Sequence, residues 1–149
     1  MNKQHNFYSE KNDSKLAFSA TWHCLTGCGI GEVIGVILGI MLGLSTLISL
    51  IIGVVLGFLF GFLLGMIPLL RANKKFKEAF KIIFISEFVS IAVMETAEVL
   101  IEIYTPGVMS AGLSSPIFWL GMLLALTGGF LAAYPVNLYL VKKGVKHQH

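Results

Sequence analysis

Residues 48–70 read ISLIIGVVLGFLFGFLLGMIPLL, an unbroken apolar run with a glycine at every fourth position from Gly53 to Gly65. A helix of about 20 apolar residues crosses the ~30 Å hydrocarbon layer of a membrane, so this run predicts a transmembrane helix. Residues four apart lie on one face of a helix, and a face of glycines lets another helix backbone approach closely. The run therefore predicts a tightly packed bundle of membrane helices.

Three further apolar segments occupy residues 17–43, 82–104 and 116–141. The first repeats the glycine pattern, with Gly27, Gly31, Gly35, Gly39 and Gly43 four residues apart. The short connection after it predicts an antiparallel hairpin, in which the two glycine stripes face either each other or a second subunit. We predict an all-α integral membrane bundle of four transmembrane helices. Asp13 or Ser14 is expected to cap the N-terminus of the first helix. Pro116 suits the first turn of the last helix, and Pro135 predicts a bend within it.

Composition and charge agree with a membrane protein. Of 149 residues, 56% are hydrophobic and 13% are charged, which excludes an ordinary soluble domain. All eleven Lys and Arg residues lie before residue 16, after residue 141 or between residues 71 and 81. The positive-inside rule then places both termini and the basic connection in the cytoplasm, so we expect a multi-pass protein of the cell (inner) membrane. Basic residues beside a membrane helix contact anionic lipid, and we expect no nucleic-acid partner.

The same charge pattern divides the chain into three parts. We predict a mobile cytoplasmic tail at residues 1–15, a transmembrane domain at residues 16–141, and a basic, histidine-bearing cytoplasmic tail at residues 142–149. Residues 74–81 predict a basic amphipathic helix or an extension of the third span. Met109, His147 and His149 are interpreted as incidental to function, and the alternative is that they hand over or collect metal.

Five of the eight carboxylates lie inside the apolar segments, where the chain has no Lys or Arg. A charged side chain in hydrocarbon costs at least ~2.5–3.5 kcal/mol and normally has a partner. These carboxylates are therefore either protonated or visited by a cation that is not part of the chain. They are Glu32, Glu87, Glu95, Glu98 and Glu102.

The stretch HCLTGCGIGE at residues 23–32 combines four candidate metal ligands. Cys24, Cys28 and Glu32 follow one another at four-residue spacing on one helix face, and His23 lies beside them. Thiolates with an imidazole suit soft or borderline ions such as Cu(I) or Zn(II). The alternative is that both cysteines are small buried apolar residues.

The stretch VMETAEVLIE at residues 93–102 carries an acidic ladder. With Glu87, the acids Glu95, Glu98 and Glu102 and the thioether of Met94 fall within roughly a 100° arc and extend about 22 Å along the helix. This one-sided ladder predicts a pathway for a cation. Alternatively, Glu95 and Glu98 share a proton as a hydrogen-bonded pair, and the two outer acids are solvated at the interfaces.

The stretches at residues 23–32 and 93–102 are expected to lie at the same depth in the membrane. The first and third helices run in the same direction, and Glu32 and Met94 come out at similar depths, ~15–20 Å into the membrane. Cys28, Glu95 and Glu98 are therefore expected to converge with them near the centre of the bundle. Tyr134 and Asn137 of the last helix lie near the depth of the cysteines, and we expect them to line the pathway.

Three segments together resemble a prokaryotic membrane-protein family known as domain of unknown function 4396. They are ATWHCLTGCGIGEVIG at residues 20–35, METAE at residues 94–98 and AAYPVNLYL at residues 132–140. The resemblance covers most of residues 17–141 and implies a four-helix membrane domain. It matches the family pattern at His23, Cys24, Cys28, Glu32, Met94, Glu95 and the segment Tyr134–Asn137, and metal handling is the function that it implies.

These patterns favour binding and translocation of a transition-metal cation, Cu(I) first and Zn(II) second, with a possible counter-flow of protons. Three alternatives stay open: a small proton-coupled organic-cation antiporter, a membrane thiol redox protein, and a structural subunit packed through its glycine stripes. The stripes also allow a homo-oligomer. The sequence contains no nucleotide-binding loop, Ser-His-Asp arrangement or CxxCH haem motif, so we do not expect an enzyme.

Overall fold

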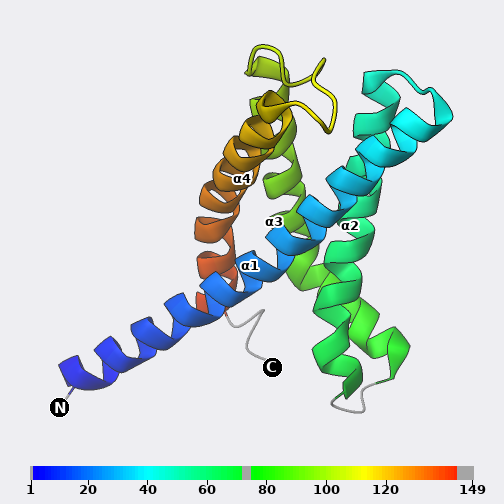
Figure 1. Cartoon of the computed structure of the whole chain (residues 1–149). Coiled ribbons are helices and arrows are strands. Elements are labelled where there is room, and N and C mark those ends of the chain that lie inside the picture. The colour runs from blue at the N-terminus through cyan, green and yellow to red at the C-terminus, as the bar shows by residue number, and fades with distance from the viewer. Residues whose placement is uncertain (1, 72–74, 144–149) are drawn as a thin grey trace.

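The structure, a computed structural model, describes residues 2–71 and 75–143, with the side chains among them except those of residues 2–11, 68, 69, 79, 82 and 86. This part of the chain forms four α-helices, which confirms the all-α class (Figure 1). They are α1 (Asn2–Leu42), α2 (Thr46–Arg71), α3 (Phe76–Tyr104) and α4 (Pro116–Lys142).

Three of these helices are long and apolar enough to cross a membrane. The spans are Asn12–Leu42 in α1, Thr46–Ile67 in α2 and Pro116–Lys142 in α4. Large apolar side chains on their outer faces are exposed, among them Ile51 and Leu131, and lipid tails cover such faces in a bilayer. The chain is therefore a multi-pass membrane protein. Helix α3 is not among the three, and it carries five glutamates in its 29 residues.

The helix ends differ from the prediction at the start of the chain. Asp13 and Ser14 lie within α1, so neither of them caps its N-terminus. Lys75 is the N-cap of α3, so the following residues form an extension of the third helix rather than a separate one. Predictions made for Lys74, His147 and His149 lie outside the described residues.

The start of α4 is as predicted. Pro116 is its first residue, and the Ser115 hydroxyl accepts a hydrogen bond from the Ile117 N–H at 3.3 Å. That bond satisfies one of the donors that a helix start leaves free. The helix continues through Pro135 to Lys142, and a bend at this proline stays a prediction.

The glycine stripes of α1 and α2 face each other, as one of the two predicted arrangements requires. A methyl group added at Gly27 would lie 2.5 Å from the backbone nitrogen of Gly61, and one added at Gly35 would lie 2.5 Å from the Cα of Gly53. Only hydrogen fits between backbones this close. The stripes are used inside the chain, so they no longer argue for a homo-oligomer, which stays a prediction.

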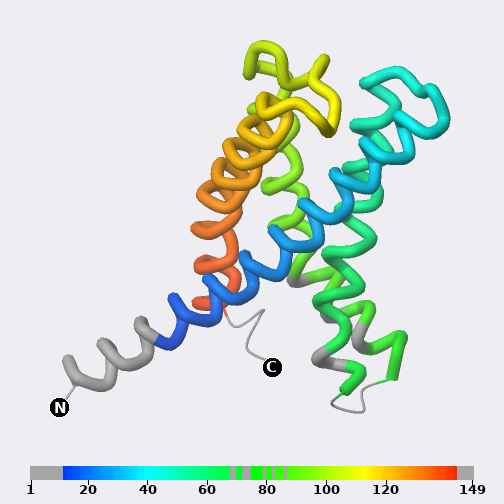
Figure 2. The backbone as a smooth tube through the Cα atoms, in the orientation of Figure 1, coloured from blue at the N-terminus to red at the C-terminus, as the bar shows by residue number. Residues whose placement is uncertain are grey.

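Helix α2 turns the other side of its stripe toward α3. Methyl groups added at Gly61 and Gly65 would contact Ile91 and Ile83 of α3. The α1–α2 and α3–α4 connections lie at one end of the molecule, and the end of α2 and start of α3 lie at the other (Figures 1 and 2). Helix α4 packs against α3 and α1. The four helices thus enclose one buried centre, on which the inward acids of α3 converge.

Candidate metal centre

A thiol and two carboxylates meet at the centre of the bundle. The Cys28 sulfur and one oxygen each from Glu95 and Glu98 all lie within 4.8 Å of one another. Cys28 comes from α1 and the two acids come from α3, and their exposed fractions are 0%, 3% and 0%. A group of this kind and spacing is able to hold a metal ion. We call it the Cys28 group; it confirms the predicted meeting of the two stretches.

The carboxylates at this centre make no standard hydrogen bonds within the described part of the chain. Among the described residues, none of the six oxygens of Glu32, Glu95 and Glu98 makes a hydrogen bond of standard geometry. Glu32 is also buried, with 6% of its surface exposed. A buried polar group without a partner costs about 1–3 kcal/mol, and more when it is charged. Three such carboxylates together therefore require either protons or a cation.

Two glycines provide the room in which the acids lie. A methyl group added at Gly129 of α4 would lie 2.5 Å from an oxygen of Glu98 and 2.8 Å from its carboxyl carbon. One added at Gly57 of α2 would overlap an oxygen of Glu95. Sequence reasoning interpreted Gly57 as part of a stripe that packs helices or lines a narrow pore, and it did not single out Gly129. The pair Gly128–Gly129, in a helix of bulky residues, is the signal that was available.

The second cysteine has a different partner. The Cys24 thiol donates a hydrogen bond to an oxygen of Glu87 at 3.1 Å, and both residues are buried. Glu87 is therefore not solvated at an interface, in contrast to one of the interpretations above. Both cysteines are free thiols. His23 is exposed, and it lines a small cavity of about 150 Å³ together with Cys24 and Glu87.

The sulfur-bearing residues form the apolar side of this centre. Met94 is fully buried and belongs to the same packed cluster as Cys24 and Cys28, together with Ile91 and Ala133. The predicted proximity of the thioether and the thiols is therefore confirmed. Methionine sulfur is a soft donor, so its place beside the Cys28 group matters for which ion that group prefers.

The Asn137 side chain is held in a buried chain of hydrogen bonds. Its side-chain N–H donates to the Thr21 hydroxyl at 2.8 Å, and its oxygen accepts a hydrogen bond from Ser90. The Thr21 hydroxyl in turn donates to the Ala17 carbonyl at 2.7 Å. This buried chain joins α4, α3 and α1 near the cysteines. Tyr134 is half-buried and stacks on Phe130 of the same helix.

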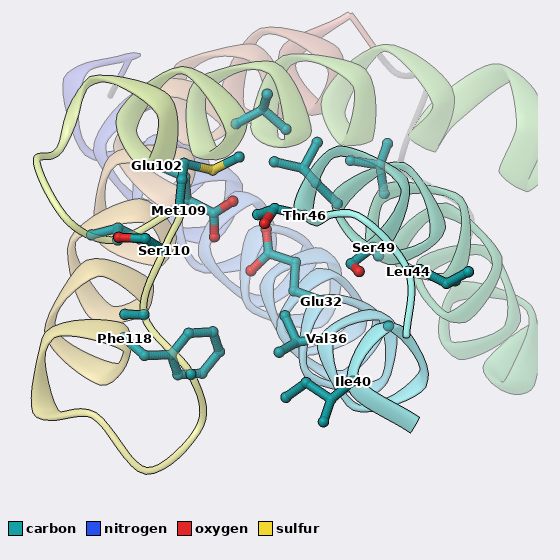
Figure 3. Close-up of a pocket in the computed structure, with 18 of the residues that line it drawn as sticks. Glu32, Val36, Ile40, Leu44, Thr46, Ser49, Glu102, Met109, Ser110 and Phe118 are labelled. Carbon is teal, nitrogen blue, oxygen red and sulfur yellow. The ribbon is translucent and has the colours of Figure 1, made fainter. Parts of the chain in front are cut away.

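A larger cavity lies near the α1–α2 connection, and Figure 3 shows residues that line it. It has a volume of about 400 Å³, and it is enclosed by the end of α1, the start of α2, the end of α3 and the connection before α4. Glu32 and Glu102 contribute their carboxylates to it, and Met109 contributes a thioether. Potential ligands thus occur in this cavity, in the Cys28 group and in the small cavity at His23.

These features define a multi-pass, all-α membrane protein with a buried group of one thiol and two carboxylates. The chain belongs to the family described as domain of unknown function (DUF4396), whose profile matches residues 14–146. The resemblance seen in the sequence is thereby confirmed. No curated protein and no solved structure shows a significant match to the chain.

Proposed function

We propose that this protein binds a transition-metal cation at the Cys28 group and moves it across the membrane. The observation that carries the proposal is the meeting of Cys28, Glu95 and Glu98 within 4.8 Å in the buried core. The absence of hydrogen-bond donors for both acids, among the described residues, adds to it. A cation supplies the positive charge that the membrane segments of the chain lack.

The donor set ranks the candidate ions. One thiolate and two carboxylate oxygens suit Zn(II), which accepts sulfur, nitrogen and oxygen ligands at about 2.0–2.3 Å. Cu(I) prefers thiolate and thioether ligands, and Met94 and Cys24 are the nearest additional sulfurs. The structure thus favours Zn(II) over Cu(I), the reverse of the ranking drawn from the sequence. Ligands must be deprotonated to bind, so uptake of the ion releases protons.

The proposal includes four membrane spans, cytoplasmic termini and a route for the ion between the two cavities. Helix α3 is the fourth span, because its acids point inward while Phe84, Val89 and Leu100 are exposed on its outer face. Both termini are cytoplasmic by the distribution of basic residues. The ion then passes between the small cavity at His23 and the larger cavity at Glu32 by way of the Cys28 group.

Elemental mass spectrometry of the protein purified in detergent, under reducing conditions, tests the binding. After loading with Zn(II), we expect one ion per chain in the wild type and little in Cys28→Ser or Glu95→Gln. Cys24→Ser is the matched control, since it removes a buried thiol one helical turn away that is not in the Cys28 group. If Cys28→Ser retains as much zinc as Cys24→Ser, the proposed site is wrong.

Reconstitution into liposomes tests the movement. A zinc-sensitive dye enclosed in the vesicles reports entry of the ion, and a pH-sensitive dye reports any proton counter-flow. We expect the wild type to carry zinc and Glu95→Gln to be inactive. Stoichiometric zinc binding without flux would reject transport while leaving the binding site in place.

A further inference from the structure

The cavity of about 400 Å³ has more room than the passage of a metal ion needs. Its walls are mostly aliphatic, and they include Val36, Ile40, Leu50 and Val54 of the α1–α2 hairpin. The ring of Phe118 closes another part (Figure 3). Cavities of about 300–1,000 Å³ with apolar walls and a few polar groups are typical binding sites for small organic molecules.

The charged groups of the cavity are all of one sign. Among the described residues that line it, Glu32 and Glu102 are ionisable and no Lys, Arg or His occurs. The carboxylate of Glu32 points into the space, opposite that of Glu102 (Figure 3). Only 6% of the surface of Glu32 is exposed. Neither of its carboxylate oxygens makes a standard hydrogen bond within the described part of the chain. Glu32 is thus a buried carboxylate that lines the cavity and makes no standard hydrogen bond within the described residues.

We propose that this cavity binds a small organic ammonium ion, with its cationic nitrogen between Glu32 and Glu102 and its apolar body against the aliphatic walls. A hydrated metal ion would be held there less well, although it could pass, because the aliphatic side chains of Val36, Ile40 and Val54 offer its water shell no hydrogen bonds. An ammonium ion with an apolar substituent matches both surfaces. The ring of Phe118 adds an aromatic face of the kind that attracts organic cations.

This site adjoins the Cys28 group, since Glu32 lies beside Glu98, but its ligands are different residues and the proposal does not rest on the proposed metal function. Glu32 and Glu102 are not members of that group, and Cys28, Glu95 and Glu98 do not line the cavity. Variants of one site therefore leave the ligands of the other in place. Loss of one activity with retention of the other separates the two proposals.

Equilibrium dialysis of the purified full chain with radiolabelled benzyltrimethylammonium tests the proposal. Unlabelled cation in excess corrects for partition into the neutral detergent, and labelled benzylsulfonate is the charge-reversed control. We expect saturable binding of about one cation per chain and none of the sulfonate. Glu32→Gln and Glu102→Gln should each weaken binding about tenfold or more, since each removes a charged partner of the ammonium group.

Two further variants distinguish binding in the cavity from a general effect of substitution on the protein. Val36→Phe fills the cavity and keeps both carboxylates, so it should also abolish binding. Cys28→Ser should bind the cation as the wild type does. Elution volume and helical circular dichroism verify that each variant is folded. The proposal is overturned if the wild type shows no saturable binding, if benzylsulfonate binds equally, or if folded Glu32→Gln/Glu102→Gln binds like the wild type.

Discussion

Gly129 has a measurable part in shaping the Cys28 group, and Gly129→Ala tests it. The added methyl group would lie 2.5 Å from an oxygen of Glu98, 2.6 Å from its Cγ and 2.8 Å from its carboxyl carbon. Ordinary contact begins at 3.4 Å, so the carboxylate must move by about 0.9 Å. Glu98 is fully buried, and its side chain has no solvent into which it can retreat.

A displacement of this size matters because metal sites tolerate little error. Ligand distances in working sites hold to about ±0.2 Å, and loss of the groups that position ligands typically costs about 10–100-fold in metal affinity. We therefore expect Gly129→Ala to weaken zinc binding by about 10–100-fold. Stability should change less, because overpacking costs about 1–3 kcal/mol and alanine regains about 1 kcal/mol of helix propensity.

Competition with a chromophoric chelator in detergent measures the zinc affinity, and thermal unfolding followed by circular dichroism measures stability. Gly29→Ala is the matched control. Its methyl group would lie 3.4 Å from a Leu126 side chain, which is ordinary contact, so zinc affinity should be unchanged. Equal zinc affinity in Gly129→Ala and Gly29→Ala would refute the reasoning that this glycine positions Glu98.

Three other perturbations have expected outcomes. Gly31→Ala places a methyl group on the backbone of Gly57, and chemical denaturation should show a loss of about 1–3 kcal/mol in the free energy of unfolding. Asn137→Ala removes the hydrogen bonds that join α4 to α3 and α1; it should cost about 1–3 kcal/mol without changing zinc stoichiometry. Cys24→Ala should destabilise the fold more than Cys24→Ser, because only the serine keeps a donor for Glu87.

Much of the fold followed from local pattern. The four-residue glycine period is a property of a single helix face, so it identified the surfaces that approach each other. The acidic arc on α3 likewise identified the inward face, because angles around a helix follow from residue number alone. Depth counted along two parallel helices was enough to bring Cys28 to Glu95 and Glu98.

The partners within that region could not be predicted in the same way. Cys24 and Cys28 are one turn apart on the same face, and the sequence treats them alike. The crossing of α1 over α3 decides that one meets Glu87 and the other meets the central pair, and a crossing depends on contacts along the whole interface. His23 is one residue from Cys24, or about 100° around the helix, which is enough to leave it exposed.

The sequence left open whether the buried acids hold protons or a cation. In the structure, the protonated form and the cation-bound form are two alternative states of the Cys28 group. Without a cation, ionised Glu95 and Glu98 and a Cys28 thiolate would place three negative charges within 4.8 Å of one another, and within the described residues neither carboxylate makes a standard hydrogen bond that would offset the repulsion. Protons remove that repulsion, and a divalent cation removes it equally well. The two occupants therefore exclude each other, and under the proposed function their exchange would couple metal movement to a proton gradient.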